Sequence, residues 1–362
     1  MNEERLSWLA FSAFEGIGPK RFALLKNYFG SAKKAWQAKK GELLAIGLGP
    51  KLTSRLVRFR RDFNPDSYFL RLRENEIECY FLDDNRYPES LKKTDNPPFV
   101  LYSKGTISPR DKLAMAVVGT RRMTNYGYQV TENLVKGLVK AGLTIVSGLA
   151  RGVDSLAHRV ALKAGGRTIG VLACGLDLVY PPENLGLVQE ITKDHGAVVS
   201  EFPLGVRPTP GSFPSRNRII SGLSLGTLVI EAPKKSGTLI TARHAAEQGR
   251  EVFAVSGPIT SPNAAGPAYL IKMGAKLVFE VDDILEELGF DKETRIKRLK
   301  EIVAENPEEE VILFLLKSQA KSIEEIVQES GFDPGQVMKL ISLMEIKGQI
   351  KNLGNMLYSI KK

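Results

Sequence analysis

The chain is poor in the residues that bind metal ions and form disulfides. Its 362 residues include only two cysteines and three histidines. Cys79 and Cys174 lie far apart in the sequence, each among apolar residues, so we expect two core thiols. The scarcity and scatter of Cys and His side chains exclude an ordinary zinc site, and we assign no metal.

Long apolar runs are also missing. No stretch of about eighteen apolar residues occurs, which argues against a membrane span. The first residues, MNEERLSWLAF, place acids before any apolar stretch, and no small-residue cleavage site follows. We therefore expect a cytoplasmic protein with no membrane partner, of a length that favours two or three domains.

Positive charge is concentrated near the N-terminus. The net charge is +10, and residues 1–61 contain thirteen Lys or Arg and four Asp or Glu, a balance of +9 that leaves +1 for the remainder. Such a basic segment suits a phosphate polymer or an acidic surface. A well-solvated helical face would have the same composition.

Two similar turns occur in this basic segment, GIGPK at 16–20 and GLGPK at 47–51. Each precedes a helix-like apolar pattern, and a proline in the first helical turn leaves N–H groups beside Lys20 or Lys51 that favour a phosphate. The repeat resembles tandem helix-hairpin-helix units, which bind DNA backbones. Lys20 and Lys51 are thus candidate secondary DNA contacts, with a purely structural pair of helical hairpins as the alternative.

The middle of the chain alternates strand-like and helix-like runs. Helical periodicity is clear at 126–142 and 154–166. The pattern predicts an α/β fold with a Rossmann-like, doubly wound, mainly parallel sheet, and ligands beyond the carboxyl ends of its strands. The expected strands lie within 113–119, 143–148, 167–175, 197–202, 226–232, 251–257 and 276–280.

The remaining segments complete a predicted division into domains. Residues 1–65 form a helical domain, 66–290 the sheet core, 291–307 a charged linker and 308–362 a winged-helix-like domain. In the last, Ser322 and Glu325 are expected to form a capping box, and Asp333 to begin the next helix. That helix, 334–347, carries only Lys339 and Lys347 as cations, which favours protein contact or weak DNA binding over base reading.

Basic and small residues follow several of the expected strands. In the first loop, Arg121 and Arg122 stand where a dinucleotide site would need glycine, so no cofactor is expected. Hydroxyls and N–H groups of 236–238 open a helix and suit an anion. The candidate residues of this groove are Gly119, Thr120, Arg121, Arg122, Ser147, Gly148, Arg151, Gly152, Phe213, Arg216, Asn217, Arg218, Lys234, Lys235, Ser236, Gly237 and Thr238.

These loops also allow other interpretations. Ser147, Asp154 and His158 do not make a convincing hydrolase, because no G-x-S-x-G elbow is present, and Asp154 is expected as a helix N-cap. The loop at 180–182 is expected mainly to shape the site. Arg216 and Arg218 suit phosphates, with an ion pair from Arg218 to an acid such as Glu231 as the structural alternative.

Five ordered motifs resemble the DprA (Smf) family of DNA-processing proteins: VVGTRRMTNYG, IVSGLARGVDSLAH, VLACGLDLVYPPEN, SEFPLGVRPTPGSFPSRNRIISGLS and SGTLITARHAAEQGREVFAVSG. The resemblance implies a non-enzymatic protein that binds single-stranded DNA, usually dimerises, and delivers strands to the RecA recombinase during natural transformation. It matches the family's binding pocket to Arg121, Phe213, Arg216 and Arg218.

The alternative function is enzymatic. The core also resembles LOG-type phosphoribohydrolases, which cleave nucleoside monophosphates and use a P-G-G-x-G-T-x-x-E stretch. Here the corresponding stretch is KKSGTLITAR, in which Thr241 stands at the position of the glutamate.

Overall fold

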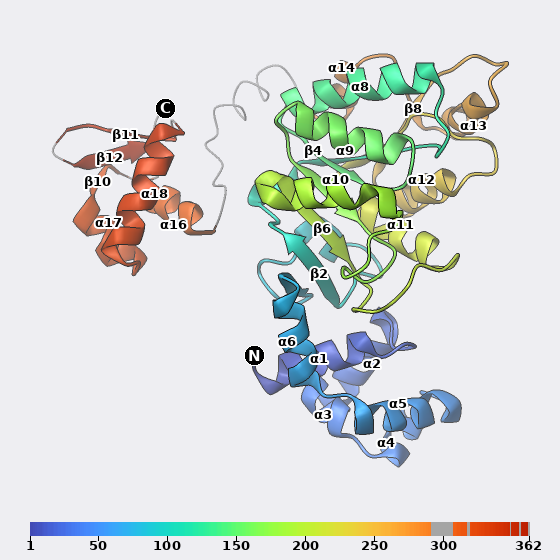
Figure 1. Cartoon of the computed structure of the whole chain (residues 1–362), viewed down its shortest axis with the longest axis vertical. Helices are drawn as coiled ribbons and strands as arrows, with labels where there is room; N and C mark the ends of the chain where they lie inside the picture. Colours follow the sequence, from blue (N-terminus) through green and yellow to red (C-terminus); the bar gives the residue numbers. More distant parts are fainter. Residues whose placement is uncertain (291–306, 317–318, 348, 355, 361–362) are drawn as a thin grey trace. The chain divides into compact units, whose positions relative to one another are not determined.

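The structure is a computed structural model that describes residues 1–290, 307–316, 319–347, 349–354 and 356–360. The chain divides into two compact units (Figure 1): Met1–Ile107 with Lys112–Ile284, and Ser108–Asp111 with Leu285–Lys362. The predicted linker lies, apart from Pro307, outside the described residues. The division into domains proposed from the sequence stays a prediction.

A nine-stranded sheet organises the first unit, in the order β1-β2-β6-β5-β4-β3-β7-β8-β9. The strands from β3 to β9 pair in parallel, whereas β2 is antiparallel to both β1 and β6. The predicted mainly parallel sheet is therefore confirmed. The strands are β1 (Ile77–Phe81), β2 (Val100–Gly105), β3 (Ala114–Val118), β4 (Thr144–Ser147), β5 (Thr168–Val171), β6 (Gly196–Ser200), β7 (Gly226–Val229), β8 (Glu251–Val255) and β9 (Lys276–Val278).

Helices cover both faces of this sheet. Chain order runs outward from β3 to β6 in one direction and from β7 to β9 in the other, so right-handed crossovers place the connecting helices on opposite faces. The first face carries α8 (Asn125–Lys140), α9 (Val153–Lys163) and α10 (Leu185–Glu190), and the second α11 (Ser212–Gly222), α12 (Gly237–Glu247) and α13 (Ala265–Lys272) (Figure 1). The direction changes between β3 and β7, where ligands of such sheets bind.

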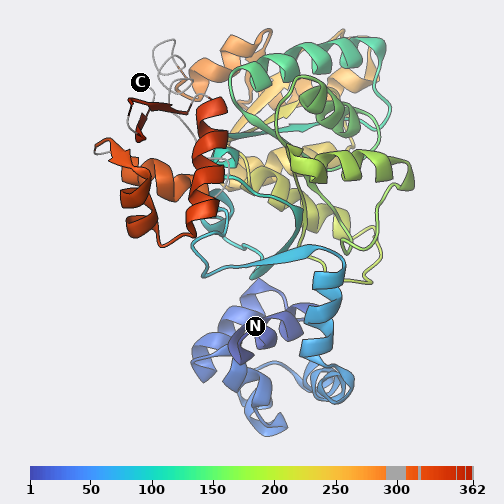
Figure 2. The same ribbon diagram turned by 60° about the vertical axis from the view of Figure 1, so that its left-hand side comes forward.

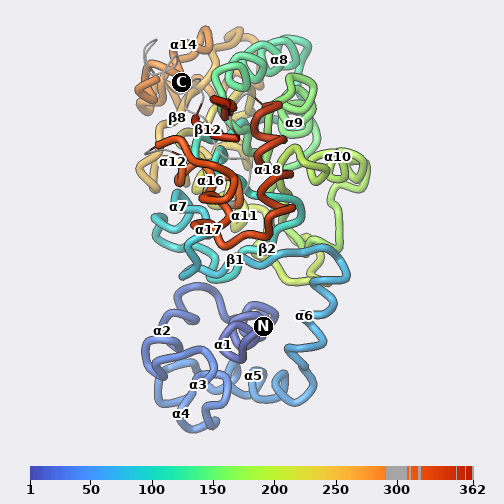
Figure 3. The backbone as a smooth tube through the Cα atoms, turned by 90° about the vertical axis from the view of Figure 1, so that its left-hand side faces the viewer, coloured from blue at the N-terminus to red at the C-terminus, as the bar shows by residue number. Residues whose placement is uncertain are grey.

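Six N-terminal helices pack against the β1–β2 end of the sheet (Figures 2 and 3). They share one hydrophobic core with it, in which Trp8 and Phe22 lie with Phe99 and Tyr102. The rings of Phe22 and Phe99 stack with centroids 4.0 Å apart. These helices are α1 (Glu3–Ala13), α2 (Pro19–Phe29), α3 (Ala32–Gln37), α4 (Lys40–Ala45), α5 (Pro50–Asp62) and α6 (Pro65–Glu74).

The second unit has a winged-helix arrangement, as the sequence predicted. Helices α16 (Pro307–Leu316), α17 (Ile323–Ser330) and α18 (Pro334–Ile346) accompany a small sheet of β10 (Lys321–Ser322), β12 (Leu357–Ile360) and β11 (Ile350–Asn352). Ser322 and Glu325 form the predicted capping box, and Asp333 caps α18. The chain also contains the short helix α7 (Glu89–Lys92) and helix α14 (Val281–Glu287).

Within the described residues, no helix is both long and apolar enough to span a bilayer. Nor does that part of the chain bring three or more His, Cys, Asp or Glu side chains together as metal ligands.

Truncating the stacked ring at the junction of helices and sheet tests the shared core. We expect Phe99→Ala to lower the free energy of unfolding by about 3–5 kcal/mol, because it leaves a cavity among buried aromatic rings. Urea denaturation followed by circular dichroism measures the change. The same truncation at Phe314, whose side chain is 74% exposed, should have little effect; equal losses at both positions would contradict a shared core.

Candidate nucleic-acid interface

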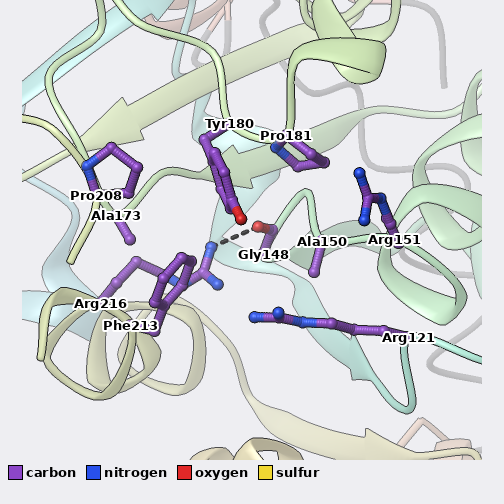
Figure 4. Close-up of a pocket in the computed structure, with 10 residues that line it drawn as sticks. All are labelled: Arg121, Gly148, Ala150, Arg151, Ala173, Tyr180, Pro181, Pro208, Phe213 and Arg216. Atoms are coloured by element: carbon purple, nitrogen blue, oxygen red, sulfur yellow. Dashed lines mark hydrogen bonds between the residues drawn. The ribbon is translucent and has the colours of Figure 1, made fainter. Parts of the chain in front are cut away.

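Two adjoining cavities lie at the carboxyl edge of the parallel strands. We call the first the aromatic cavity (Figure 4); it is lined by Arg121, Gly148, Ala150, Arg151, Ala173, Tyr180, Pro181, Pro208, Phe213 and Arg216. The second, the switch-point crevice, lies where the sheet changes direction and is lined by residues that include 118–122, Asp154, Asn217, Pro233, 235–238, Thr241 and Asn263. Arg121, Ala150, Phe213 and Arg216 line both cavities.

The structure brings most of the predicted groove residues to these two cavities. The cavities include Gly119, Thr120, Arg121, Arg122, Gly148, Arg151, Phe213, Arg216, Asn217, Lys235, Ser236, Gly237 and Thr238. Ser147, Gly152, Arg218 and Lys234 do not line either of them. Ser147 is buried and its hydroxyl donates to the carbonyl of Val117 at 2.6 Å, so its place in the predicted groove is wrong.

Arg216 is a buried brace rather than an exposed phosphate ligand. Its side chain comes from α11, the residue is only 4% exposed, and Nη1 donates to the carbonyls of Gly148 and Val171 at the ends of β4 and β5 (Figure 4). Burial lowers the pKa of Arg216 to about 10, against the opposing charge of Asp154. Within the described chain no group accepts a hydrogen bond from Nη2, so Arg216 still offers charge to the cavities.

Two glycines allow this close packing. A Cβ on Gly148 would lie 2.6 Å from Nη2 of Arg216, so any side chain there would displace the guanidinium. Gly152 begins α9 with φ of +76°, and a Cβ on it would lie 2.3 Å from the carbonyl oxygen of Thr120. Gly152, and not Asp154 as the sequence suggested, is the N-cap of α9.

Arg218 points to a different partner. Its guanidinium donates to the carboxylate of Glu201 and to the carbonyl of Asn96, and the side chains of the ion pair are 14% and 15% exposed. Burial raises the pKa of Glu201, and Arg218 opposes that shift. The predicted phosphate contact of Arg218 is therefore not supported by its position, and its acid partner is Glu201 instead of Glu231. The carboxylate of Glu231 instead accepts hydrogen bonds from the N–H and the hydroxyl of Thr124, the N-cap residue of α8.

Four predicted cations remain exposed without a carboxylate partner in the described residues: Arg121, Arg122, Lys234 and Lys235. Three of them line the crevice, and Lys234 is next to it in the sequence. Arg151 differs, since its exposed guanidinium pairs with Glu183. The edge of the sheet thus carries an excess of positive charge that the described residues do not neutralise.

Aromatic rings stand beside this charge. The centroids of Tyr180 and Phe213 are 5.8 Å apart, and the guanidinium carbon of Arg121 lies 5.4 Å from the centroid of Phe213. Tyr180 is 43% exposed. The sequence singled out Phe213 and favoured a loop-shaping role for Tyr180, with an aromatic face as the alternative; the Tyr-Pro-Pro stretch in the loop that follows β5 was the signal for it.

Helix α12 turns its N-terminus to the crevice. Ser236 is the N-cap and accepts from the N–H of Thr238, while the Thr238 hydroxyl donates to the carbonyl of Gly119 at 3.0 Å. The turn before α12 is thereby fixed to the loop after β3. The helix dipole adds positive potential at this point.

The site holds no set of groups arranged for nucleophilic catalysis within the described residues. His158 is fully buried, its Nδ1 pairs with the Thr168 hydroxyl at 2.6 Å, and burial lowers its pKa to about 3. Asp154 is the only carboxylate that lines either described cavity; burial raises its pKa to about 6, against the pull of Arg216. Thr241, at the position of the phosphoribohydrolase glutamate, lines the crevice and offers no carboxylate.

Lys20 and Lys51 are not part of these cavities. Both are exposed at the second residue of a helix, α2 and α5, each with glycine as N-cap and proline at its first turn, as the repeat predicted. The two turns are neighbours, because a Cβ on Gly16 would lie 2.7 Å from Cδ1 of Leu52. Lys20 and Lys51 therefore belong to neighbouring turns of the N-terminal helices.

The fold and the site define a class: doubly wound α/β proteins with arginines in place of the dinucleotide-binding glycines and with an appended winged helix. The model of the DNA recombination-mediator protein A family matches residues 78–289, and that of the DprA winged helix domain matches residues 300–356. The chain belongs to the DprA family.

Individual proteins of the same family are similar to this chain in sequence and in structure. Protein Smf of Synechocystis is 39% identical over 80% of this chain and 73% of its own length, and the DNA processing protein DprA of Bacillus subtilis is 47% identical over 60% and 73%. The X-ray structure of DprA from Streptococcus pneumoniae matches 79% of this chain and 98% of its own, at 33% identity and a TM-score of 0.69. A Helicobacter pylori DprA structure, described as revealing a single-stranded DNA binding mode, matches 59% and 95%, at 31% identity and a TM-score of 0.53.

Removing the arginine of the buried ion pair separates a structural role from DNA contact. We expect Arg218→Ala to lower the free energy of unfolding by about 3–5 kcal/mol, because it leaves the Glu201 carboxylate buried without its partner. Urea denaturation measures this loss. Arg151→Ala breaks an exposed pair and should cost about 0–1 kcal/mol. If Arg218→Ala leaves the stability unchanged, the structural role is wrong and Arg218 is again a candidate phosphate contact.

Proposed function

We propose that the protein binds single-stranded DNA through the two cavities at the carboxyl edge of its sheet. The observation that carries the proposal is the convergence there of unpaired cations with the half-buried ring of Phe213 and the exposed ring of Tyr180. Single strands bind to basic grooves that follow phosphates and to aromatic rings on which bases stack, without sequence preference. The single-stranded DNA bound by the Helicobacter pylori relative supports the same ligand class here.

Each part of the site has a role in this proposal. Arg121, Arg122 and Lys235 contact phosphates, and Lys234 contributes charge at the rim. Phe213 and Tyr180 stack with bases, and the N–H groups at the start of α12 add donors. Arg216 positions α11 and contributes its charge, whereas Arg218 serves the fold.

We further propose that the protein is a recombination mediator that protects incoming strands and delivers them to RecA during natural transformation. Membership of the recombination-mediator family supports this role. Lys20 and Lys51 supply a secondary DNA contact on the N-terminal helices. The protein is proposed to act without catalysing a reaction or holding a cofactor, because Thr241 and a buried Asp154 replace the acid that a phosphoribohydrolase needs.

The winged helix is proposed as a protein-contact unit. Two of its lysines are already engaged, Lys321 with Glu329 and Lys347 with Glu309. Met338 and Ile346, on α18, are 55% and 83% exposed. Lys339 is exposed on the same helix, but open apolar residues beside it suit a protein partner better than a DNA groove.

A homodimer is proposed through the outer edge of the sheet. Strand β9 is the last strand of the sheet, and large apolar residues around it are exposed: Phe279 by 78%, Met273 by 69% and Tyr269 by 48%. An exposed apolar edge of this kind is buried in a partner or becomes a site of aggregation.

Substituting the exposed arginine of the first loop tests DNA binding. We expect Arg121→Ala to weaken binding of a dT20 oligonucleotide and to reduce the slope of log K against log salt by about 0.7, the value for one phosphate contact on a single strand. Fluorescence anisotropy over a salt series measures both. Arg243→Ala, at an exposed arginine of α12 paired with Glu247, is the matched control. Equal salt slopes for wild type and Arg121→Ala would refute the assignment.

Placing a charge at the sheet edge tests the dimer. We expect Phe279→Arg to convert the dimer to a monomer, because an arginine buried in an apolar interface lacks a carboxylate partner. Light scattering after size-exclusion chromatography gives the mass. Tyr28→Arg, an exposed aromatic on α2, should leave the mass unchanged. A monomeric wild-type protein would disprove the proposed dimer.

A further inference from the structure

We propose that the switch-point crevice is a site for a terminal phosphate monoester of a nucleotide, so that the protein distinguishes the phosphorylated end of a strand from its interior. This inference rests on the proposed binding of single strands and goes beyond it. An internal phosphodiester carries one charge and two free oxygens, whereas a terminal monoester approaches two charges and has three free oxygens. The hydrogen-bond donors of the crevice suit the terminal monoester.

Donors of three kinds converge on the crevice from different elements. Arg121 and Arg122 come from the loop after β3, Lys235 from the loop after β7, and Gly237 from the first turn of α12. The backbone N–H groups of residues 234–237 have no hydrogen-bond partner in the part of the chain that the structure describes. Consecutive free N–H groups at a helix N-terminus form an anion cradle.

An independent observation is the hydroxyl of Thr241. The residue is 98% buried, being 2% exposed, yet it lines the crevice, and the described residues offer its hydroxyl no hydrogen-bond partner. The hydroxyl is not among the fully buried polar atoms that lack a partner, so it reaches the open space of the crevice, where it can donate a hydrogen bond to an oxygen of a bound ligand. Thr241 lies on α12 one turn after Gly237, so its hydroxyl is placed to complement the N–H groups of the cradle.

The positive charge of the crevice favours binding of an anion, and the described residues of the crevice lack the groups needed to catalyse a reaction of that anion. Its exposed cations have no carboxylate partner among the described residues, and its one carboxylate, Asp154, is 6% exposed and accepts from the N–H of Ala150. Without an accessible acid or base, the crevice binds a phosphate and leaves it intact.

The shape of the site explains why the phosphate belongs to a nucleotide. Arg121 and Phe213 line both cavities, so a phosphate in the crevice lies one residue away from the rings of the aromatic cavity. A terminal nucleotide fits this arrangement, with its base against Phe213 and Tyr180 and its phosphate at α12. The same chemistry is offered by a strand end and by a free nucleoside monophosphate.

The experiment compares strands that differ only at their ends. Anisotropy titrations use the full-length protein and internally labelled dT20 with a 5′-phosphate, with a 3′-phosphate or with hydroxyls at both ends. We expect one phosphorylated strand to bind about tenfold more tightly than the hydroxyl strand, since a hydrogen-bonded charged group contributes about 1.5 kcal/mol or more. Equal affinity for all three strands would overturn the proposal.

A conservative variant shows whether the crevice causes the difference. Thr241→Val keeps the volume and removes the hydroxyl; it should reduce the ratio of the affinities for the phosphorylated and the hydroxyl strand at least threefold. Thr53→Val is the matched control, because Thr53 is a fully buried threonine of α5 whose hydroxyl also has no partner in the described structure. An undiminished preference in Thr241→Val, or an equal loss in Thr53→Val, would contradict the assignment.

Competition identifies the source of the phosphate. Thymidine monophosphate is added as a competitor of the phosphorylated strand. If it displaces the strand at concentrations close to the strand's own dissociation constant, the crevice is a site for free nucleotides. If displacement needs far higher concentrations, the crevice is a site for strand ends. Either result supports a monoester site. Failure of the proposed function looks different, because the hydroxyl strand itself would then not bind, or Arg121→Ala would bind it as the wild type does.

Discussion

The buried guanidinium of Arg216 is the constraint on which the proposed nucleic-acid site depends. This positive charge is buried away from water. The carbonyls of Gly148 and Val171 accept hydrogen bonds from it, and the carboxylate of Asp154 interacts with it electrostatically. Those contacts join the ends of two strands to α11. Because α11 also carries Phe213 and Asn217, the position of the Phe213 ring and of one wall of the crevice follows from this single buried charge.

A second constraint is the direction change of the sheet. It places the loop after β3 and the loop after β7 side by side, and the hydrogen bond from Thr238 to Gly119 holds them together. Arg121 and Arg122 from one part of the sequence and Lys235 from a distant part thereby face one crevice. Their mutual repulsion is not relieved by carboxylates of the described chain, so a bound polyanion would relieve it.

Arginines that look alike in the sequence have different roles in the structure. Arg216 and Arg218 are separated by one residue on α11, yet one braces the sheet ends beside the cavities and the other pairs with Glu201 away from them. On a helix, positions two apart point in different directions, so a short basic motif can divide its work between structure and binding. Arg151, at the rim of the aromatic cavity, is held by Glu183, which leaves Arg121 as the exposed cation beside Phe213.

The sequence by itself determined the seven parallel strands, the winged helix with its capping box, and the loops that form the site, because apolar periodicity and helix caps are local properties. It did not reveal β1 and β2, since their pairing depends on the N-terminal helices that pack on them. It could not tell that Arg216 and Ser147 are buried, that Arg218 meets Glu201, or that Tyr180 lies beside Phe213. These are contacts between residues far apart in the chain, and only the tertiary packing decides which charge is paired and which remains open to a ligand.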